Sequence, residues 1–169
     1  MSDGDADLIS VLQRQEEDLV LESFDHADAW TLGVGLVELA QAAGHAVGID
    51  IRRPGLILFR AALPGITPDQ DFWIARKAAL VLRMESSSAL VDARLSAAGI
   101  DAASIGWLGA EYAITGGSLP VRVRGVGVVA ALTVSGLSSE NDHDLAVDGL
   151  RRHLHAAGSG VGSRVGGVR

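Results

Sequence analysis

The stretch VGIDIRRPGLILFRAAL, residues 47–63, decides the fold. Its first part places apolar residues at every second position from Val47 to Ile51, with Asp50 between two of them, and this period indicates a strand with one buried face. RPG at 53–55 then turns the chain into a second, more apolar strand at 56–63. Because the connection is so short, we expect an antiparallel hairpin, which argues against a doubly wound parallel sheet.

A second hairpin is predicted between residues 121 and 134. Val121 and Val123 alternate with arginines, and Gly125 and Gly127 permit a tight turn before a long apolar run. That run reads as a central strand, since a half-exposed strand would carry polar residues at alternate positions.

Helices are predicted from apolar residues at helical spacing and from capping residues. The start of one helix has the most complete capping signal. Thr67 is the expected N-cap, Pro68 takes the first helical position, and the Gln70 side chain can accept from the backbone N–H of Thr67. The other predicted elements are a helix from Leu8, a short strand at 19–24, a helix capped by Asp25 or Asp28 and stopped by Gly44, a further turn or two at 89–95, an irregular segment at 99–115, and a final helix opened by Ser138 or Ser139.

Together these elements predict an α/β (α+β) fold, with one mostly antiparallel sheet of four to five strands flanked by helices. A chain of 169 residues with 48% hydrophobic residues fits one domain with a sizeable core. We predict an acidic leader at 1–7, a single domain at 8–155 and a flexible Gly/Ser/Arg-rich tail at 156–169.

Composition excludes several kinds of protein. The chain has no cysteine, so disulfides and thiolate chemistry are excluded, and we predict no metal site. A formal net charge of −7 and an aromatic content of 4% disfavour nucleic acid as a partner. The N-terminus lacks the basic start and apolar run of a signal peptide, and no apolar run reaches membrane length, which predicts a cytoplasmic protein without a membrane partner.

Three segments carry a family resemblance: LPGITPDQDFWIARK at 63–77, ITGGSLPVRV at 114–123 and VVAALTVSGLSSENDHDLAVDGL at 128–150. Taken in this order, they resemble the HbpS-like family, also called GlcG-like or haem-degrading domain proteins, and in particular its uncharacterised branch. The resemblance covers roughly residues 8–155. It implies a profilin-like sandwich that assembles into homodimers or larger rings, with haem binding or degradation in some relatives.

The segment around the double glycine is the first candidate binding region. Relatives of this branch commonly carry histidine immediately before the two glycines, whereas this chain has Thr115, whose hydroxyl is a poor iron ligand beside imidazole. Gly116, Gly117 and Ser118 are candidates to present backbone N–H groups to an anion, because glycine lets a backbone approach closely. The alternative is a loop that only turns the chain into the next strand.

Other candidate ligand-binding residues lie on two helices. Trp73, Arg76 and Lys77 are candidates to line a cleft and to pair with carboxylates such as haem propionates, or else form a half-solvated helix face. His143, in line with the apolar face of the last helix, is either a structural histidine or a ligand or proton donor at a pocket. The two nearby aspartates, Asp142 and Asp144, are interpreted as solvated charges.

The sequence contains no self-contained catalytic constellation, so function is inferred as binding. The leading hypothesis is a self-associating domain that binds a small, partly apolar ligand that can be anionic, with haem as the named candidate cofactor. The first alternative is an enzyme that degrades haem or another small molecule, with Tyr112 or His143 at the iron. The second alternative is an assembly protein without a polar pocket.

Overall fold

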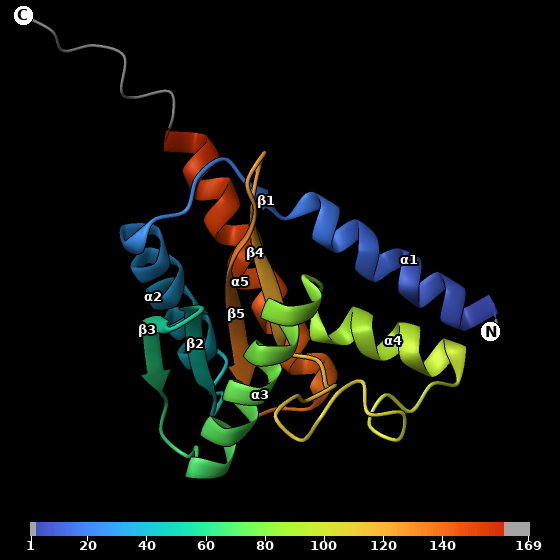
Figure 1. Ribbon diagram of the computed structural model, residues 1–169. Helices are drawn as coiled ribbons and strands as arrows, with labels where there is room; N and C mark the ends of the chain where they lie inside the picture. Colours follow the sequence, from blue (N-terminus) through green and yellow to red (C-terminus); the bar gives the residue numbers. More distant parts are fainter. Residues whose placement is uncertain (1–2, 161–169) are drawn as a thin grey trace, which may run out of the picture.

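The computed structural model describes residues 3–160 (Figure 1). Its elements, in chain order, are α1 (Asp3–Asp18), β1 (Val20–Leu21), α2 (His26–Ala42), β2 (Gly48–Arg53), β3 (Leu56–Ala62), α3 (Pro68–Met84), α4 (Ser88–Ala98), β4 (Ser118–Val123), β5 (Gly127–Ser135) and α5 (Ser139–Gly160).

The five strands form one sheet in the order β1-β4-β5-β2-β3. Both predicted hairpins, β2–β3 and β4–β5, are antiparallel, and β2 pairs antiparallel with β5 to join them. Among these strands, β1 alone runs parallel to its neighbour, β4. The predicted fold class is therefore confirmed: the sheet is mostly antiparallel, five-stranded and flanked by helices.

The helix starts follow the capping residues. The Asp25 side chain accepts hydrogen bonds from the backbone N–H groups of Ala27 and Asp28, so Asp25 is the cap of α2. Thr67 and Gln70 form the expected capping box of α3. Ser138 caps α5, because its hydroxyl accepts from the backbone of Asn141 at 3.2 Å. These local signals fix where the helices begin.

The helices form layers on both sides of the sheet (Figure 1). α2 and α5 pack together and cover one face, while α3 covers the other face with α4 beside it. α1 packs along α4, so the two helices lie side by side at the margin of the molecule. None of the helices within residues 3–160 has the length and hydropathy needed to cross a membrane.

The face under α2 and α5 is apolar. It belongs to a continuous cluster of buried side chains from the sheet and both helices. The strand members of that cluster are Leu21, Ile49, Ile51, Phe59, Leu119, Val121, Ala130, Leu132 and Val134. Burial of this surface at about 25 cal/mol per Å² is the main stabilising contribution to the fold.

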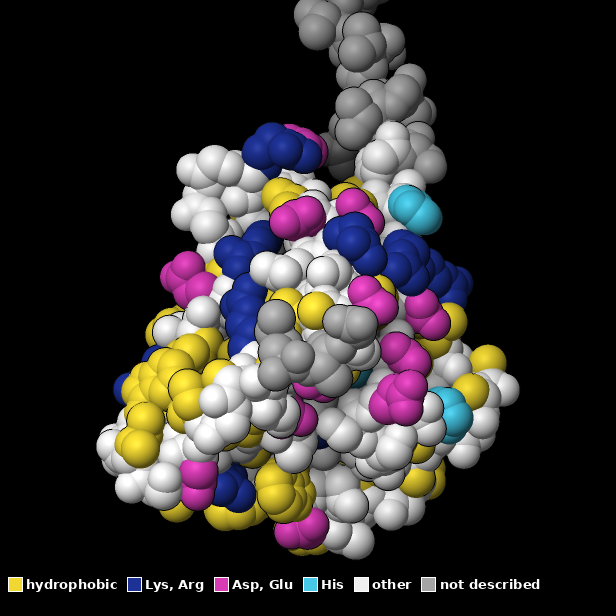
Figure 2. All heavy atoms as spheres, turned by 90° about the vertical axis from the view of Figure 1, so that its right-hand side faces the viewer, with side chains coloured by type: hydrophobic (Ala, Val, Ile, Leu, Met, Phe, Trp, Pro, Cys, Tyr) yellow, Lys and Arg dark blue, Asp and Glu magenta, His cyan; other side chains and the backbone are white. Residues whose placement is uncertain are grey.

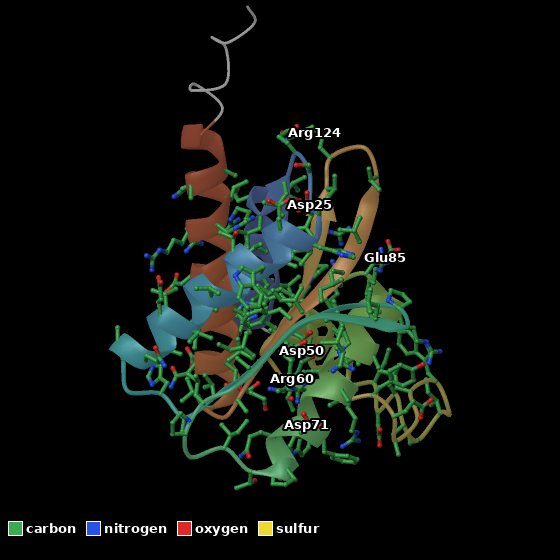
Figure 3. All side chains as sticks on the ribbon, turned by 90° about the vertical axis from the view of Figure 1, so that its left-hand side faces the viewer. Asp25, Asp50, Arg60, Asp71, Glu85 and Arg124 are labelled. Atoms are coloured by element: carbon green, nitrogen blue, oxygen red, sulfur yellow. The ribbon has the colours of Figure 1, made fainter. Side chains whose placement is uncertain are left out.

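The face under α3 is also buried, which differs from the one-face burial expected for β2. Gly48 lies so close to α3 that an added Cβ would stand 2.7 Å from Ile74. Asp50 is fully buried, and its carboxylate accepts from Arg52 at 2.6 Å and from Arg60 at 3.0 Å. Arg60 also pairs with Asp71 of α3, so the three labelled side chains Asp50, Arg60 and Asp71 lie in a row from the sheet to the helix (Figure 3).

Three predicted boundaries were wrong. α1 begins at Asp3, so residues 3–7 of the expected leader are helical. α4 is a full helix because the Ser87 side chain, interpreted as part of a polar break, caps it by accepting from Leu90. α5 continues past His155 to Gly160 because Ala156 and Ala157 extend it, and residues 161–169 of the expected tail lie outside the described residues.

Candidate functional site

Two hollows flank the segment that connects the long irregular loop to β4. The first, which we call the Lys77 hollow, has a volume of about 260 Å³ and lies between the start of α3 and the β5–α5 connection. The second, the His143 hollow, has a volume of about 570 Å³ and lies between α1, α4 and the first turn of α5. Ser139 lines both hollows, so they lie on two sides of the same helix start.

A buried ion pair forms the floor of the Lys77 hollow. The ammonium group of Lys77 on α3 donates to Asp142 Oδ2 at 2.9 Å and to the Val134 carbonyl at 3.3 Å, and both charged side chains are almost fully buried. The other oxygen of Asp142 accepts from the Leu137 backbone at 2.9 Å. A buried ion pair is held only where such extra hydrogen bonds satisfy its remaining atoms. The prediction that Asp142 is a solvated charge was therefore wrong.

Gly117 explains why the ion pair fits beneath the loop. Its φ of +117° lies in a region that favours glycine, and its backbone passes directly over the pair. A Cβ at this position would stand 2.5 Å from the Val134 carbonyl oxygen and 2.9 Å from Lys77 Nζ. Glycine is required here for both the backbone angle and the space.

The walls of the Lys77 hollow combine an indole with several hydroxyl groups. Trp73 donates its indole N–H to Asp69 at 3.2 Å, which ties the ring to the first turn of α3. Thr115, Ser135 and Ser139, which carry hydroxyl groups, are also lining residues. Of the candidate residues, Trp73, Lys77 and Thr115 thus meet in one hollow, and their role in ligand binding stays a prediction.

Arg76 and Tyr112 lie outside the linings of both hollows. Arg76 stacks over the Phe72 and Trp73 rings and donates to the Ala110 and Tyr112 carbonyls, so it fastens the irregular loop to α3. The Tyr112 ring is half-buried and lies 4.8 Å from the Arg83 guanidinium. Both residues support the loop from which Thr115 projects.

Gly116 and Ser118 continue the loop into the sheet. The Gly116 N–H donates to the Ser139 hydroxyl at 2.5 Å, which ties the loop to the start of α5. Ser118 is fully buried, and its hydroxyl shares a hydrogen bond of 2.8 Å with Thr133. The backbone N–H of Ser118 donates to Ser88 at 3.1 Å. The N–H groups of Gly116 and Ser118 therefore already have protein acceptors, which favours the interpretation of this segment as a turn into β4.

His143 faces inward, as the helical spacing predicted, and is 5% exposed. Its Nε2 lies 3.0 Å from Gln15 Oε1 of α1, and its Nδ1 is buried without a hydrogen-bond partner among the described residues. Burial lowers the pKa of His143, against the opposing charges of Asp144 and Glu16. The lowered pKa favours the neutral imidazole, and its unpaired Nδ1 is enclosed by the protein.

No group of three or more His, Asp or Glu side chains within the described part of the chain is placed to hold a metal ion. Sequence reasoning missed Ser135, Ser139 and the role of Asp142 in the Lys77 hollow. Asp142 and Lys77 lie on helices far apart in the chain, and helical spacing alone does not show that they meet. The available signal was the charged position of Lys77 among the apolar positions of α3.

Comparison with known proteins places the chain in a family. The model of the family described as "Haem degrading protein HbpS-like" matches residues 24–151. The chain therefore belongs to the HbpS-like family, and the resemblance inferred from its three segments is confirmed.

Individual relatives cover the same region. A UPF0303 protein of Streptomyces coelicolor is 49% identical over 150 residues, which is 88% of this chain and 95% of the relative. The crystal structure of Ybr137w protein is 30% identical with a TM-score of 0.81 and covers 88% of each chain. The crystal structure of a PduOC:heme complex shares the fold at 21% identity, with a TM-score of 0.66 and coverage of 78% of this chain and 94% of the other.

Proposed function

We propose that this chain is a small-molecule-binding domain whose Lys77 hollow takes an anionic, partly apolar ligand, with haem as the first candidate. The observation that carries the proposal is the buried Lys77 ammonium, which lines a hollow together with Trp73 and three hydroxyl-bearing residues. The two carboxylates of the lining are already engaged, Asp142 with Lys77 and Asp69 with the Trp73 indole N–H. Val134 and Asp142 take two of its three N–H donors, which leaves one for a carboxylate of the ligand. The family's haem-related description and the haem complex of a structural neighbour support the choice of haem.

The size of the hollow limits how haem would bind. At about 260 Å³ it is smaller than the roughly 300–1,000 Å³ of pockets that enclose a drug-sized ligand. A hollow of this volume would hold one edge of the porphyrin, with a propionate on Lys77 and the face of the porphyrin ring against Trp73. Haem supplies iron redox chemistry when bound, and the Thr115 hydroxyl is a weak iron ligand compared with imidazole. The proposal is therefore binding, without an assigned reaction.

A haemin titration followed by absorbance tests this proposal. The key variant is Lys77→Met/Asp142→Asn, which removes both charges of the pair and so leaves no buried charge without a partner. We expect a saturable Soret shift for the unmodified chain and about tenfold weaker binding for the double variant. His143→Ala, in the other hollow, is the matched control and should bind haemin unchanged. Equal binding by the double variant, or loss only in His143→Ala, would overturn the assignment of the site.

The family description also favours a second candidate, an enzyme that degrades haem. Tyr112 lies outside the Lys77 hollow and His143 lines the other one, so neither proposed iron ligand meets Thr115 there. The same titration with an added reductant distinguishes the two functions. Progressive loss of the haem spectrum would favour the enzyme, and a stable spectrum would favour the binding domain.

Self-association belongs to the same proposal and is supported by an exposed apolar edge. β3 is an edge strand of the sheet, where Leu56 and Ile57 are 43% and 51% exposed. Trp30, 64% exposed, packs its ring edge-to-face on Phe59 of the same strand. A second copy that pairs with this edge would cover both the strand and the indole. We expect light scattering to give a dimer or larger ring, and Ile57→Lys to reduce the mass; a monomer before substitution would contradict this.

A further inference from the structure

The His143 hollow has apolar walls that the Lys77 hollow lacks. It is the larger of the two, at about 570 Å³, and its apolar lining comes from α1 and α4: Leu8, Val11, Leu12, Ala89 and Ala93. Leu8 and Val11 remain 52% and 44% exposed at its mouth. A ligand with an apolar body would remove this surface from water.

Among the described residues, the aspartate and glutamate side chains are the charged ones that line this hollow. Asp5, Asp92, Glu140 and Asp144 line it, and no lysine or arginine of the described residues does so. Figure 2, which faces this side of the molecule, shows acidic side chains beside its centre, with Lys and Arg side chains above them. Burial raises the pKa of Asp92, and the hydrogen bond from the Ser96 hydroxyl at 3.4 Å offsets only part of this rise. A cation in the hollow would offset the free-energy cost of burying the charged Asp92 carboxylate.

His143 adds a hydrogen-bond acceptor to the same lining. Because Gln15 Oε1 is an acceptor, Nε2 of the neutral imidazole carries the hydrogen and donates to it at 3.0 Å. Nδ1 is then a lone-pair acceptor, and it has no donor among the described residues. This buried nitrogen costs free energy while it is unpaired, and an N–H donor of a ligand reaches it only when the side chains that enclose it move.

We propose that the His143 hollow is a second binding site, for an organic ammonium ion with an apolar body. The apolar walls accept the body and the acidic rim accepts the charge, while the His143 ring lies in the lining beside the bound ion. Haem propionates carry the opposite charge, so this site is independent of the one proposed at Lys77.

Three probes of one shape and different charge test this proposal. They are phenethylammonium, the neutral phenethyl alcohol and the anionic hydrocinnamate, each titrated by calorimetry and by nuclear magnetic resonance of the histidine rings. We expect saturable binding of phenethylammonium with shifted His143 ring signals, weaker binding of the alcohol and none of the anion. Equal binding of all three probes, or no binding of the ammonium, would overturn the proposal.

Matched variants test whether the acidic lining of the hollow holds the probe. Asp92→Asn should weaken phenethylammonium binding about tenfold, whereas Asp148→Asn, an exposed acid of α5 outside the hollow, should leave it unchanged. The Lys77→Met/Asp142→Asn variant should also bind the probe normally, so failure of the haem proposal would not affect this test. If the probe and Leu8→Ser both dissociate an oligomer, the hollow is an interface between copies and the proposal is wrong.

Discussion

The two faces of the sheet are built from different residues. Towards α2 and α5 the strands present mostly leucine, isoleucine and valine. Towards α3 and α4 they present Gly48, Asp50, Ser118 and Thr133, beside one apolar contact of Ala131 with Ala78 and Val81 of α3. Both faces are buried, but only the second has to satisfy charges and hydroxyls through specific partners. An apolar face tolerates substitutions of similar volume, whereas a polar face depends on each partner. The Lys77 hollow opens at the end of the polar face, where this dependence supplies ligand-binding groups.

The largest effect should come from breaking the ion pair of the polar face. Lys77→Met leaves the Asp142 carboxylate buried without its cation, which should cost about 3–5 kcal/mol of unfolding free energy. The Lys77→Met/Asp142→Asn variant should recover most of this loss. On the apolar face, Leu132→Ala should cost about 2–5 kcal/mol with no second substitution that rescues it. Urea denaturation measures all three, and a double variant as unstable as Lys77→Met would contradict the account.

A smaller effect is expected from closing the space above the pair. Gly117→Ala combines an unfavourable backbone angle with contacts to the Val134 carbonyl and Lys77, and should cost about 3 kcal/mol. Gly125→Ala is the matched control, since its φ is +73° but nothing lies within 4 Å of the added Cβ. It should cost about 1 kcal/mol. Equal losses in thermal unfolding would show that backbone angle alone matters and that the close fit over Lys77 does not.

The smallest effect concerns His143 and depends on pH. Burial lowers its pKa in the folded chain, so below the ordinary value of 6.5 the unfolded chain binds a proton that the folded chain does not. Stability should therefore fall as pH drops through about 6.5 towards the lowered pKa, and should be constant for this group above that range. His143→Gln should remove part of the slope. His153, whose pKa burial also lowers, is present in both proteins and cancels in the difference. If the unfolding free energy of the unmodified chain and of His143→Gln had the same slope against pH, the buried, neutral imidazole would be contradicted.

Most of the fold was predictable because its signals are local. The capping box at Thr67, the hairpin turn at 53–55 and the alternation in β2 each depend on neighbouring residues. The parallel pairing of β1 with β4 joins Val20 to Arg122, and no local pattern encodes such a contact. α4 was shortened for a different reason, since a serine that caps a helix resembles a polar break.

The candidate site was predicted only in part, because only some of its contacts lie between neighbouring positions of one helix. Of the three residues predicted to line one cleft, Trp73 and Lys77 lie one helical turn apart and line the same hollow, whereas Arg76 does not. Asp142 was interpreted as solvated, because an aspartate in the first turn of a helix is usually exposed and only the approach of α3 buries it. His143 was grouped with Thr115, Trp73 and Lys77 as well as with Gly116; it shares its hollow with Gly116, whereas the other three line the Lys77 hollow. Which side of a helix start faces which cavity is decided by tertiary packing.

The most direct test of the central claim, that the polar face ends in the ligand site, is to locate a bound porphyrin. Gallium protoporphyrin, a diamagnetic analogue of haem, added to isotope-labelled protein shifts the resonances of the residues it contacts. The account predicts shifts at the Trp73 indole, at Lys77 and at the Thr115 backbone, with Trp30 and His143 unchanged. Shifts centred on His143 or Trp30, with none at Lys77, would contradict it.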